Sequence, residues 1–556
     1  MIASLLLLLL QQAAPPTAPP TAPVAEPVAQ PVAQPVQTSG GPLTATEAAY
    51  DVLHYDLALE VRPAERTIDG RSTMTARALE PASTIELDLD GSLTVAAVTS
   101  EHGPLRFAHA NGRVRIDFAE PLRAGERFAV AVDYGGAPRV APRPPWEGGF
   151  TWSHTADGSP WIATTCQGEG ADLWWPCKDQ PGDEPESMDL FITIPAGLFC
   201  ASNGVLVSDE TAGDRRTQHW HVASPINNYS VALNIAPYVA LETTFDSVGG
   251  ESVPVTFWVL PEDVEPGRAL LPQFLEHLAF LEELCGPYPF RAEKYGVVET
   301  PHLGMEHQTI IAYGNHFRPG PQGFDWLHHH ELSHEWWGNL VTCRDWKDMW
   351  LHEGFATYMQ ALYVERLHGP AALRDAMARK AAGLANRLPV APRETRDTKA
   401  IYFADRDGRD SDLYDKGAWA LHTLRWLIGD EAFFAALRRM AYPDPALERV
   451  TDGSQTRFAD TDDFRILAEA CAKRDLDWFF EVYLRQPALP RLETRREGSE
   501  LVLRWVPPFE TAFPMPVGLR VGDELRRIEM PDAGEQRVEI GDAEFEIDPG
   551  GWLLRE

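Results

Sequence analysis

Alternating hydrophobic and polar residues predict β structure in the first half of the chain. In "DVLHYDLALEV" (51–61), apolar residues occupy every second position from Leu53 through Tyr55 and Leu57 to Val61, opposite polar or small neighbours. This pattern is typical of a strand with one buried face. The segments "TIELDLD" (84–90), "RVRIDF" (113–118) and "FAVAVDY" (128–134) repeat it at short intervals. We therefore expect a β domain that extends to about residue 245.

The period of the apolar residues then becomes helical. It stays helical from "PGRALLPQFLEHLAFLEELCG" (266–286) to about Leu484, and alternation returns in "ELVLRWV" (500–506), "QRVEI" (536–540) and "EFEIDPGGWLL" (544–554). The pattern predicts a multidomain α+β protein. We expect an N-terminal β-sandwich-like domain (45–245), a mainly helical domain (246–487) and a small C-terminal β domain (488–556).

The first 44 residues carry no pattern of a folded domain. "MIASLLLLLLQQAA" (1–14) is a short apolar run followed by small residues, which indicates a cleaved signal peptide, although the first basic residue of the chain is Arg62. The run is too short to cross a bilayer. Residues 15–44 repeat Pro, Ala and Val units that cannot pack, so we interpret them as an extended tether. We expect an exported protein, periplasmic or extracellular, without a stable membrane span.

Composition restricts the class of partner. The 556 residues are 44% hydrophobic, enough for a large core. The 82 acidic and 49 basic residues give a formal net charge of −33, which disfavours nucleic acid or an anionic membrane as a partner. The 6 cysteines are too few for a disulfide framework. Cys166 and Cys177 either pair in an oxidising compartment or remain free thiols.

The segment "LHHHELSHEWWGNL" (327–340) contains an unusual density of metal-ligating side chains. His330 and His334 are four positions apart, so a helix presents both rings on one face, one turn apart. Glu331 lies between them and can reach a water at the metal without ligating it, which is the H-E-x-x-H arrangement. His328 and His329 lack this spacing, and we expect them to cap or flank the helix.

A second segment offers a third ligand. Glu353 in "DMWLHEGFATYMQALYVERL" (348–367) stands nineteen positions after His334, at the start of another amphipathic helix. A turn between the two helices lets them lie antiparallel, so that the carboxylate completes a His2Glu site. A structural zinc uses four protein ligands, whereas three leave a position for water. We therefore predict one catalytic Zn2+ per chain, held by His330, His334 and Glu353.

These motifs resemble those of the zinc aminopeptidases related to aminopeptidase N and leukotriene hydrolase, which are gluzincin metallopeptidases. "HELSHEWWGNLVT" followed by "WLHEGFATY" matches the family signature of H-E-x-x-H, eighteen residues and Glu. "YPFRAEKYGVVETPHLGMEHQT" (288–309) resembles the approach to the family's exopeptidase motif, and "YDKGAWALHTL" (414–424) resembles the helix with its catalytic tyrosine. The resemblance covers residues 50–487 and implies a thermolysin-like catalytic domain.

The resemblance also implies roles for individual residues. Glu331 matches the general base that takes a proton from the zinc water, and Tyr414 matches the tyrosine whose hydroxyl supports the oxyanion. Tyr414 follows the run "DSD" (410–412), which is typical of a helix start. Asn339 and Glu335 are candidates for residues that support the site from behind, or they are solvated helix positions.

Glu306 in "LGMEH" (303–307) matches the glutamate that binds the free α-amino group of the substrate. An ammonium in a dry cleft needs such an anionic partner. Gly304 and Met305 of the same motif are expected to contact substrate. The family usually reads Gly-Ala-Met-Glu-Asn here, so Leu303 and His307 are departures that change the shape of the pocket.

A second residue is implied at the substrate amine. Gln167 in "CQGEGADLWWPC" (166–177) aligns with a Gln or Glu that binds the amine in the family, and Glu169 is its rival. The sequence thus predicts a zinc-dependent aminopeptidase that acts on peptides with a free N-terminal amine.

Two alternatives remain open. A thermolysin-like endopeptidase would share the zinc site without needing Glu306. A catalytically silent peptide-binding protein is a member of a different class, and it would be expected to have lost zinc ligands that are present here. The chain ends soon after the small β domain, so we also expect a more open cleft than in relatives with a large helical C-terminal domain.

Overall fold

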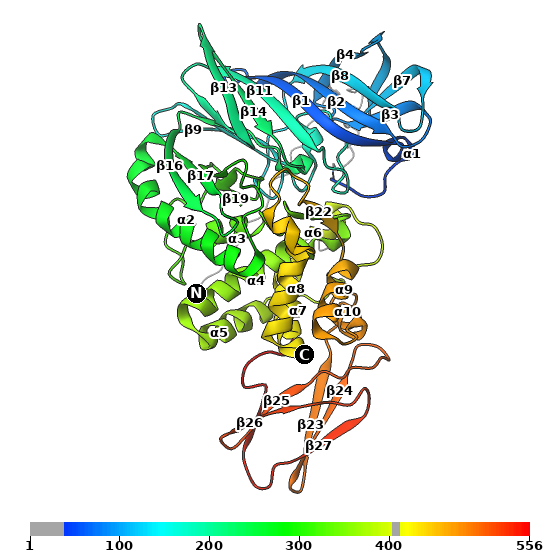
Figure 1. Ribbon diagram of the computed structural model, residues 1–556, viewed down its shortest axis with the longest axis vertical. Helices are drawn as coiled ribbons and strands as arrows, with labels where there is room; N and C mark the ends of the chain where they lie inside the picture. The colour runs from blue at the N-terminus through cyan, green and yellow to red at the C-terminus, as the bar shows by residue number, and fades with distance from the viewer. Residues whose placement is uncertain (1–37, 403–411) are drawn as a thin grey trace, which may run out of the picture. The chain divides into compact units, whose positions relative to one another are not determined.

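The computed structural model describes residues 38–402 and 412–556. The predicted signal peptide (1–14), most of the predicted tether and the first two residues of the "DSD" run lie outside this range. Within it, strands dominate as far as Val259, helices dominate from there to Tyr483, and strands return at Arg491 (Figure 1). The predicted succession of β, helical and β regions is confirmed.

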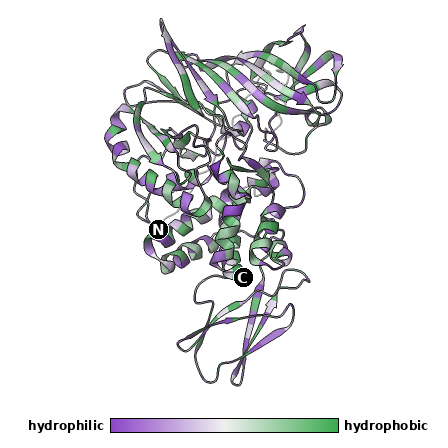
Figure 2. Ribbon diagram, in the orientation of Figure 1, coloured by the Kyte–Doolittle hydropathy of each residue, from purple (hydrophilic) through white to green (hydrophobic). Residues whose placement is uncertain are grey.

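The largest sheet contains eight strands in the order β13-β14-β11-β1-β2-β8-β4-β5. The alternation predicted for 51–61 is present in β1, where Tyr55, Leu57 and Leu59 are buried, and Figure 2 shows apolar and polar positions alternating across this sheet. Strand β1 runs parallel to β11 and antiparallel to β2. The strands span β1 (Tyr50–Arg62), β2 (Thr67–Ala78), β4 (Leu93–Ser100), β5 (Gly103–Pro104), β8 (Arg127–Gly136), β11 (Ser187–Pro195), β13 (Val205–Ala212) and β14 (Arg215–Val222).

Two smaller sheets complete the N-terminal region. One has the order β3-β7-β6 and the other β12-β15-β10-β9. The loop that follows β10 carries Gln167 and then the buried pair Trp174 and Trp175, and Trp175 packs edge-on against Tyr55 of the large sheet with ring centroids 4.8 Å apart. The strands span β3 (Ala82–Asp88), β6 (Arg106–Ala110), β7 (Arg113–Leu122), β9 (Gly149–His154), β10 (Pro160–Thr165), β12 (Phe199–Ala201) and β15 (Asn234–Ala236).

The predicted boundary at residue 245 falls inside a strand. Strand β16 (Val239–Asp246) pairs with β17 (Ser252–Val259), and this hairpin continues into a five-stranded sheet of the order β16-β17-β18-β20-β19. Helix α2 (Val264–Cys285) packs closely on it, because a Cβ at Gly267 would lie 2.9 Å from Leu241 of β16. The boundary therefore precedes β16, and alternation alone could not tell to which sheet this strand belongs. The remaining strands are β18 (Tyr295–Glu299), β19 (Gly304–Met305) and β20 (Ile311–Tyr313).

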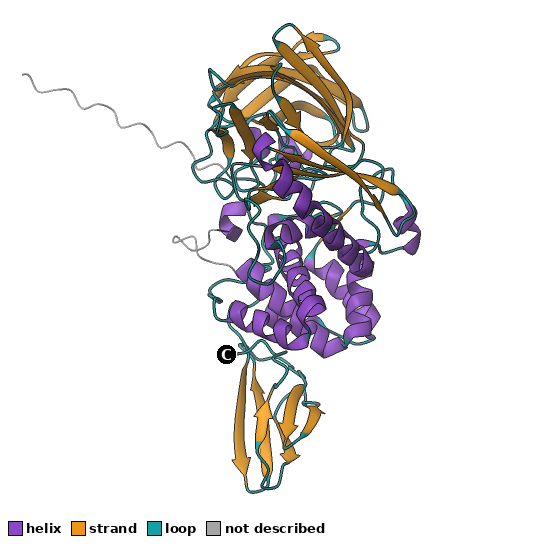
Figure 3. Ribbon diagram, turned by 90° about the vertical axis from the view of Figure 1, so that its left-hand side faces the viewer, coloured by secondary structure: helices purple, strands orange, loops and turns teal. Residues whose placement is uncertain are grey.

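Helices form the region that follows this sheet, as Figure 3 shows. A short strand, β21 (Val341–Cys343), lies between α3 and α4 and pairs with β22 (Arg457–Ala459). No helix in the described part of the chain is both long and apolar enough to span a bilayer. The helices span α1 (Ala45–Ala48), α2 (Val264–Cys285), α3 (Trp326–Ser333), α4 (Trp350–His368), α5 (Pro370–Ala381), α6 (Thr398–Tyr402), α7 (Asp412–Ile428), α8 (Asp430–Ala441), α9 (Thr461–Ala472) and α10 (Asp477–Tyr483).

The C-terminal region consists of two three-stranded sheets, β23-β24-β27 and β26-β25-β28. The chain enters this region between the end of α10 at Tyr483 and the start of β23 at Arg491, and the boundary predicted from the sequence, between 487 and 488, falls in this interval. The ring of Trp552 near the chain end stacks on His422 of α7, with centroids 4.4 Å apart. The strands span β23 (Arg491–Glu497), β24 (Glu500–Val506), β25 (Val517–Val521), β26 (Glu524–Ile528), β27 (Glu535–Glu539) and β28 (Phe545–Ile547).

The last residues assigned to the tether, 38–44, are held by the folded chain. Ser39 is buried, its backbone N–H donates to the hydroxyl of Thr398, and its own hydroxyl accepts from the indole N–H of Trp346. Small polar residues can satisfy buried backbone in this way, so their composition did not reveal where packing starts. Cys166 and Cys177 are buried and free, which removes the alternative that they form a disulfide.

Candidate active site

The two histidines of the H-E-x-x-H motif lie at the C-terminal end of α3. Asp325 caps this helix by accepting a hydrogen bond from the backbone N–H of His328. His334 is the C-cap residue, and its ring lies beside that of His330, with the two Nε2 atoms 3.3 Å apart. The Nδ1–H of His334 donates to the carbonyl of Trp337 at 2.9 Å, which leaves the Nε2 lone pair available to a metal.

His328 and His329 do not cap or flank α3, contrary to the expectation. Both rings are buried between α3 and its neighbouring helices. His328 stacks on Phe274 of α2 with centroids 3.5 Å apart, and His329 packs on Tyr363 of α4 with centroids 4.7 Å apart. Burial lowers the pKa of both imidazoles well below the usual value, so they are neutral. They are packing residues that hold α3 between α2 and α4.

Glu353, in the first turn of α4, faces both histidines. Its Oε2 atom lies 3.4 Å from His330 Nε2 and 3.5 Å from His334 Nε2, and it is buried without a hydrogen-bond partner among the described residues. Tetrahedral Zn2+ with bonds of about 2.0–2.1 Å holds its ligand atoms about 3.3 Å apart. The three donor atoms therefore already have the spacing that zinc requires.

Two further carboxylates lie next to this triad. Ligand atoms of Glu306, Glu331 and His334 all lie within 4.8 Å of one another. Burial, together with the neighbouring charge of Glu306, raises the pKa of Glu331 well above its usual value. Three buried carboxylates that converge on two imidazoles form a site in which a dication is electrostatically favoured. Glu331 lies outside the triad itself, with a carboxylate oxygen within 4.8 Å of a ring nitrogen of His334.

Helices α4 and α7 cross at a pair of glycines. A Cβ at Gly354 would lie 2.9 Å from the Cα of Gly417, and a Cβ at Gly417 would lie 2.9 Å from the Cα of Gly354. Because these contacts are to backbone, a side chain on either residue has to push the helices apart. Glu353 and Tyr414 sit on the two helices close to this crossing, so the glycine pair sets the distance between them.

The crossing yields a first prediction. Gly417→Ala is expected to lower the free energy of unfolding by about 1–3 kcal/mol, the range for overpacking a tight contact. It should also lower kcat, because Tyr414 moves away from Glu353. Denaturant unfolding and steady-state kinetics measure both effects. Gly91→Ala is the matched control, since a Cβ there meets nothing within 4 Å. Equal stability of the two variants would contradict the close crossing.

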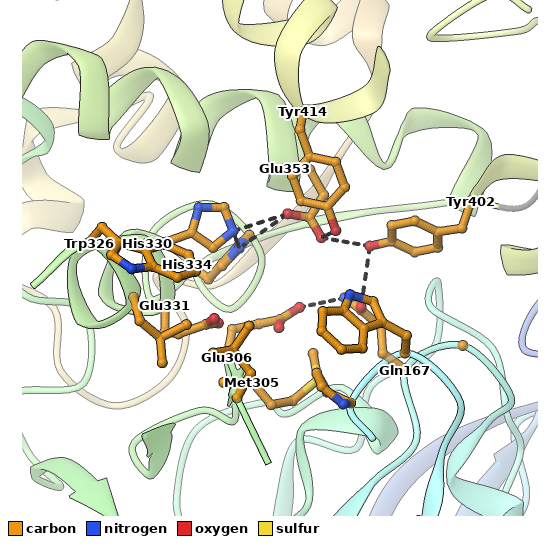
Figure 4. A pocket seen from close by; sticks show the side chains of 16 residues that line it. Gln167, Met305, Glu306, Trp326, His330, Glu331, His334, Glu353, Tyr402 and Tyr414 are labelled. Carbon is orange, nitrogen blue, oxygen red and sulfur yellow. Dashed lines mark hydrogen bonds and ion pairs between the residues drawn. The ribbon is translucent and has the colours of Figure 1, made fainter. Parts of the chain in front are cut away.

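Two tyrosines converge on the zinc-ligand candidate. The hydroxyl of Tyr414, near the start of α7, donates to Glu353 Oε1 at 2.9 Å. The hydroxyl of Tyr402, at the end of α6, lies 2.6 Å from the same oxygen and 3.2 Å from Gln167 Oε1. Figure 4 shows both rings pointing toward Glu353. The sequence identified Tyr414 by its motif, whereas Tyr402 carries no motif and was missed.

Glu306 and Gln167 come from different regions and meet in the cavity. The side-chain amide of Gln167 donates to Glu306 Oε1, as does the hydroxyl of Tyr229 at 3.1 Å. Asn339 donates to the backbone carbonyl of Glu306 at 3.0 Å and so fixes the loop. Burial raises the pKa of Glu306 to about 7. Tyr229 was also missed by the sequence analysis, because it lies far from every motif.

Glu169, the rival of Gln167, points elsewhere. Its carboxylate accepts a hydrogen bond from the backbone N–H of Gly148 at 2.7 Å and pairs with Arg139 at 3.5 Å. It does not line the cavity that contains Gln167. The structure therefore brings Gln167, and not Glu169, to Glu306.

Gly304 and Met305 form the short strand β19 at the edge of the cavity. A Cβ at Gly304 would lie 2.5 Å from Glu331 Oε1 and 2.6 Å from Leu327 Cδ1, so the missing side chain leaves room for the Glu331 carboxylate. His307, the other departure from the family motif, is buried, and burial lowers its pKa to about 3. It is a neutral packing residue behind the motif.

Glu335, the other residue considered for support, holds the same loop as Asn339. Its carboxylate accepts from the backbone N–H of Thr309 at 2.9 Å. Burial raises its pKa to about 8. Both side chains thus connect the end of α3 to the segment that carries Glu306, and neither is a solvated helix position.

One cavity of about 390 Å³ connects the site, within the range of about 300–1,000 Å³ that is typical of ligand sites. The residues discussed above that line it are His330, His334, Glu353, Glu331, Glu306, Gln167, Gly304, Met305, Tyr402 and Tyr414. Its walls away from the carboxylates and imidazoles are mostly apolar or aromatic. They include Pro145, Trp146, Leu303, Met305, Trp326, Leu327 and Tyr402. Among the described residues that line it, the only carboxylates are those of Glu306, Glu331 and Glu353, and no Lys or Arg is present.

Family models agree with this site. The Peptidase M1 N-terminal domain matches residues 52–229, and the Peptidase family M1 domain matches residues 322–450, which include His330, His334 and Glu353. Together these two models cover more than half of the chain. The chain belongs to peptidase family M1.

Relatives within peptidase family M1 are distant in sequence. Human aminopeptidase B (Homo sapiens) is 28% identical over 422 residues, which is 69% of this chain and 61% of the relative. Leukotriene A-4 hydrolase of Xenopus laevis is 25% identical over 348 residues, 58% of this chain and 53% of the relative. This chain spans less than two thirds of the length of either relative.

A solved M1 structure matches more completely. The crystal structure of an M1 zinc metallopeptidase mutant from Deinococcus radiodurans, bound to a Tyr-Ser-Ala substrate, superposes with a TM-score of 0.63 at 26% identity. The match covers 79% of this chain and 95% of that chain. The predicted architecture of the M1 family is therefore confirmed for the described residues.

Proposed function

We propose that this chain is a zinc-dependent aminopeptidase that removes the N-terminal residue from peptides. The observation that carries the proposal is that Glu306 and Gln167 line the same cavity as the cluster of His330, His334 and Glu353. A buried carboxylate is stabilised by a cationic partner, because an unpaired buried charge is costly. The free α-ammonium group of a peptide is such a cation, and it lies one residue from the first peptide bond. The aminopeptidase relatives, and the M1 enzyme with a bound tripeptide, support this assignment.

In the proposed reaction, different residues bind the zinc and transfer the proton. When bound by His330, His334 and Glu353, zinc supplies a Lewis acid that makes water a nucleophile near neutral pH. Glu331 takes the proton from the attacking water as it adds to the scissile carbonyl. It then delivers that proton to the leaving amine.

The remaining groups position the substrate. Glu306 and Gln167 bind the α-ammonium group and thereby place the first peptide bond beside Glu331. The hydroxyl of Tyr414 turns from Glu353 Oε1 toward the oxygen of the scissile carbonyl and donates to it as negative charge develops. The hydroxyl of Tyr402 contacts both Gln167 and Glu353 and so fixes their side chains relative to each other.

Tyr414→Phe should lower kcat by about two to three orders of magnitude with little change in KM, which is typical of losing one oxyanion donor. Steady-state kinetics on an aminoacyl amide measure it. Tyr402→Phe is the companion variant, and it should act mainly on KM because its hydroxyl contacts Gln167. An effect of Tyr414→Phe on KM alone would mean that its ring packs against substrate.

The substrate class follows from the cavity walls. No Lys or Arg lines the described part of the cavity, so an acidic first residue lacks a partner, while Trp146, Leu303 and Trp326 suit a large apolar one. A panel of aminoacyl fluorogenic amides tests the function and this preference together. We expect leucine, methionine and phenylalanine amides to be cleaved, aspartate amides to be poor, and a zinc chelator to stop all turnover. Absence of hydrolysis of any free-amine amide would overturn the proposal.

Two other functions are less well supported. A thermolysin-like endopeptidase would use the same triad but has no use for a buried Glu306 aimed at the substrate. A silent peptide-binding protein would not need Glu331 and Tyr414 beside a complete set of zinc ligands. The arrangement of these groups favours the aminopeptidase.

We also infer that the protein is exported, periplasmic or extracellular, from the apolar run and Pro-rich segment at residues 1–44. Fractionation of the source cells tests this. Activity in the cytosolic fraction, on a chain that still begins at Met1, would contradict it.

A further inference from the structure

A cluster of histidines and aspartates lies on the large sheet, away from the catalytic cavity. His54 and Asp56 belong to β1, Asp189 to β11, and His219 and His221 to β14, three strands that are neighbours in the sheet (Figure 1). Asp56 is the register partner of Asp189, and Asp189 is the register partner of His221. Segments far apart in the sequence thus place five metal-ligating side chains together.

These side chains occupy the solvent face of the sheet. The residues that alternate with them, such as Tyr55, Leu190 and Trp220, are buried. The side chains of His54 and Asp189 are 22% and 20% exposed, and that of Asp56 is 50% exposed. A cation from solution can therefore reach them, and water molecules can complete its coordination.

Three donor atoms have the spacing of metal ligands. His54 Nε2 lies 3.5 Å from Asp56 Oδ1 and 3.5 Å from Asp189 Oδ2, and all three atoms lie within 4.8 Å of one another. Charge-assisted hydrogen bonds between such groups are shorter, about 2.7–2.9 Å. The separation instead equals that between His334 and Glu353 in the zinc triad, which is 3.5 Å.

Neighbouring side chains orient these donors. His54 Nδ1 hydrogen-bonds with the hydroxyl of Ser187 at 2.8 Å, and when it donates there the Nε2 lone pair faces the two carboxylates. The N–H groups of His219 and His221 donate to Asp189 Oδ1 at 2.6 and 2.9 Å. The other carboxylate oxygen, Oδ2, is the one that faces His54 Nε2. Metal-ligating imidazoles and carboxylates are usually oriented by hydrogen bonds of this kind.

We propose that His54, Asp56 and Asp189 form a second, non-catalytic binding site for a divalent transition-metal ion of the zinc type. Imidazole together with carboxylate suits Zn2+ and its neighbours, whereas Ca2+ and Mg2+ prefer oxygen ligands alone. The bound ion links β1 to β11, the parallel pair inside the eight-stranded sheet, and so stabilises the N-terminal region. This inference does not depend on the proposed peptidase activity.

The test counts zinc per chain. The full protein is equilibrated with buffered Zn2+ at a pH above the ordinary histidine pKa of about 6.5, in excess Ca2+ to occupy acidic surface, and then analysed for metal. We expect two zinc ions per wild-type chain. His54→Ala and Asp189→Asn should each retain one, with unchanged peptidase kinetics, because neither residue lines the catalytic cavity. His102→Ala, an exposed histidine outside the cluster, is the control and should retain two.

Three results would overturn the proposal. One is a wild type that binds a single zinc, which would leave the cluster as a hydrogen-bonded network around Asp189. Another is a second zinc that persists in both His54→Ala and Asp189→Asn, which would place it elsewhere. The third is a second zinc that excess Ca2+ displaces, because such binding belongs to the acidic surface and not to an imidazole site.

Discussion

Glu331→Gln is expected to lower kcat by about two to four orders of magnitude, the range for losing a general base, while the protein keeps its zinc. The amide cannot accept the proton of the attacking water, yet His330, His334 and Glu353 remain in place. Glutamine has nearly the same shape, so the space beside Gly304 is still filled without strain. Substrate binding should survive, because Glu306 and Gln167 are untouched.

Elemental analysis, steady-state kinetics and a direct binding measurement separate these effects. Glu283→Gln, an exposed glutamate on α2, is the control and should behave like the wild type. If Glu331→Gln turned over at the normal rate, another group would have to be the base. If it lost its zinc, Glu331 would be a ligand and the triad would be wrong.

Glu353→Gln is expected to remove metal and activity together. The Glu353 carboxylate is the only anionic member of the triad, and its Oε2 atom lies 3.4–3.5 Å from both imidazoles. A neutral amide is a much weaker zinc ligand, and two histidines alone do not make a stable site. Zinc content after dialysis against a weak chelator should be lower than that of the wild type by one equivalent, and kcat/KM should fall in proportion.

A further arm excludes a folding defect. Burial opposes ionisation of Glu353, but the facing rings of His330 and His334 hold its pKa well below the usual value. Without the metal, glutamine therefore removes a favourable charge interaction, and some loss of stability is expected. Circular dichroism should still show a folded chain. Full zinc content in a folded Glu353→Gln protein would contradict the assignment of this ligand.

The zinc triad could be predicted from sequence because its logic is local. His330 and His334 are one helical turn apart, and Glu353 lies in the first turn of α4, the α-helix that follows α3 in the chain. Helical periodicity fixes such geometry without knowledge of the rest of the fold. Glu306, Gln167 and Tyr414 were found only through resemblance to a family, since no spacing rule connects β19, the loop after β10 and α7.

Tyr402 and Tyr229 could not be predicted, because each reaches the site from a segment without a motif. Their contacts, Tyr402 to Glu353 and Tyr229 to Glu306, join residues 49 and 77 positions apart. The same limit applies to His328. A histidine beside a zinc motif looks polar in the sequence, yet tertiary packing against α2 makes it a neutral core residue.

The domain boundary was misplaced for a related reason. Strand β16 has the same alternation as the strands before it, and only its pairing with β17 assigns it to the later sheet. Alternation reports which face of a strand is buried but not which sheet covers it. The alternation within each strand was therefore predicted correctly, whereas the sheet to which β16 belongs was not.

We propose that Glu306 and Gln167 restrict cleavage by this zinc site to the first peptide bond of a substrate. The triad, Glu331 and Tyr414 can act on any amide carbonyl. A fixed anionic group one residue upstream is what requires a free ammonium, and an acetylated terminus leaves the buried Glu306 against a neutral amide. That mismatch costs about 2–4 kcal/mol.

The most direct measurement compares kcat/KM for a leucine-initiated peptide and its acetylated twin, with wild type and Glu306→Ala. The wild type should prefer the free amine by about thirtyfold to a thousandfold, at 1.4 kcal/mol per factor of ten. Glu306→Ala should keep its zinc and lose most of that preference. Equal cleavage of both peptides by the wild type, with cuts inside the chain, would contradict the account and identify a thermolysin-like endopeptidase.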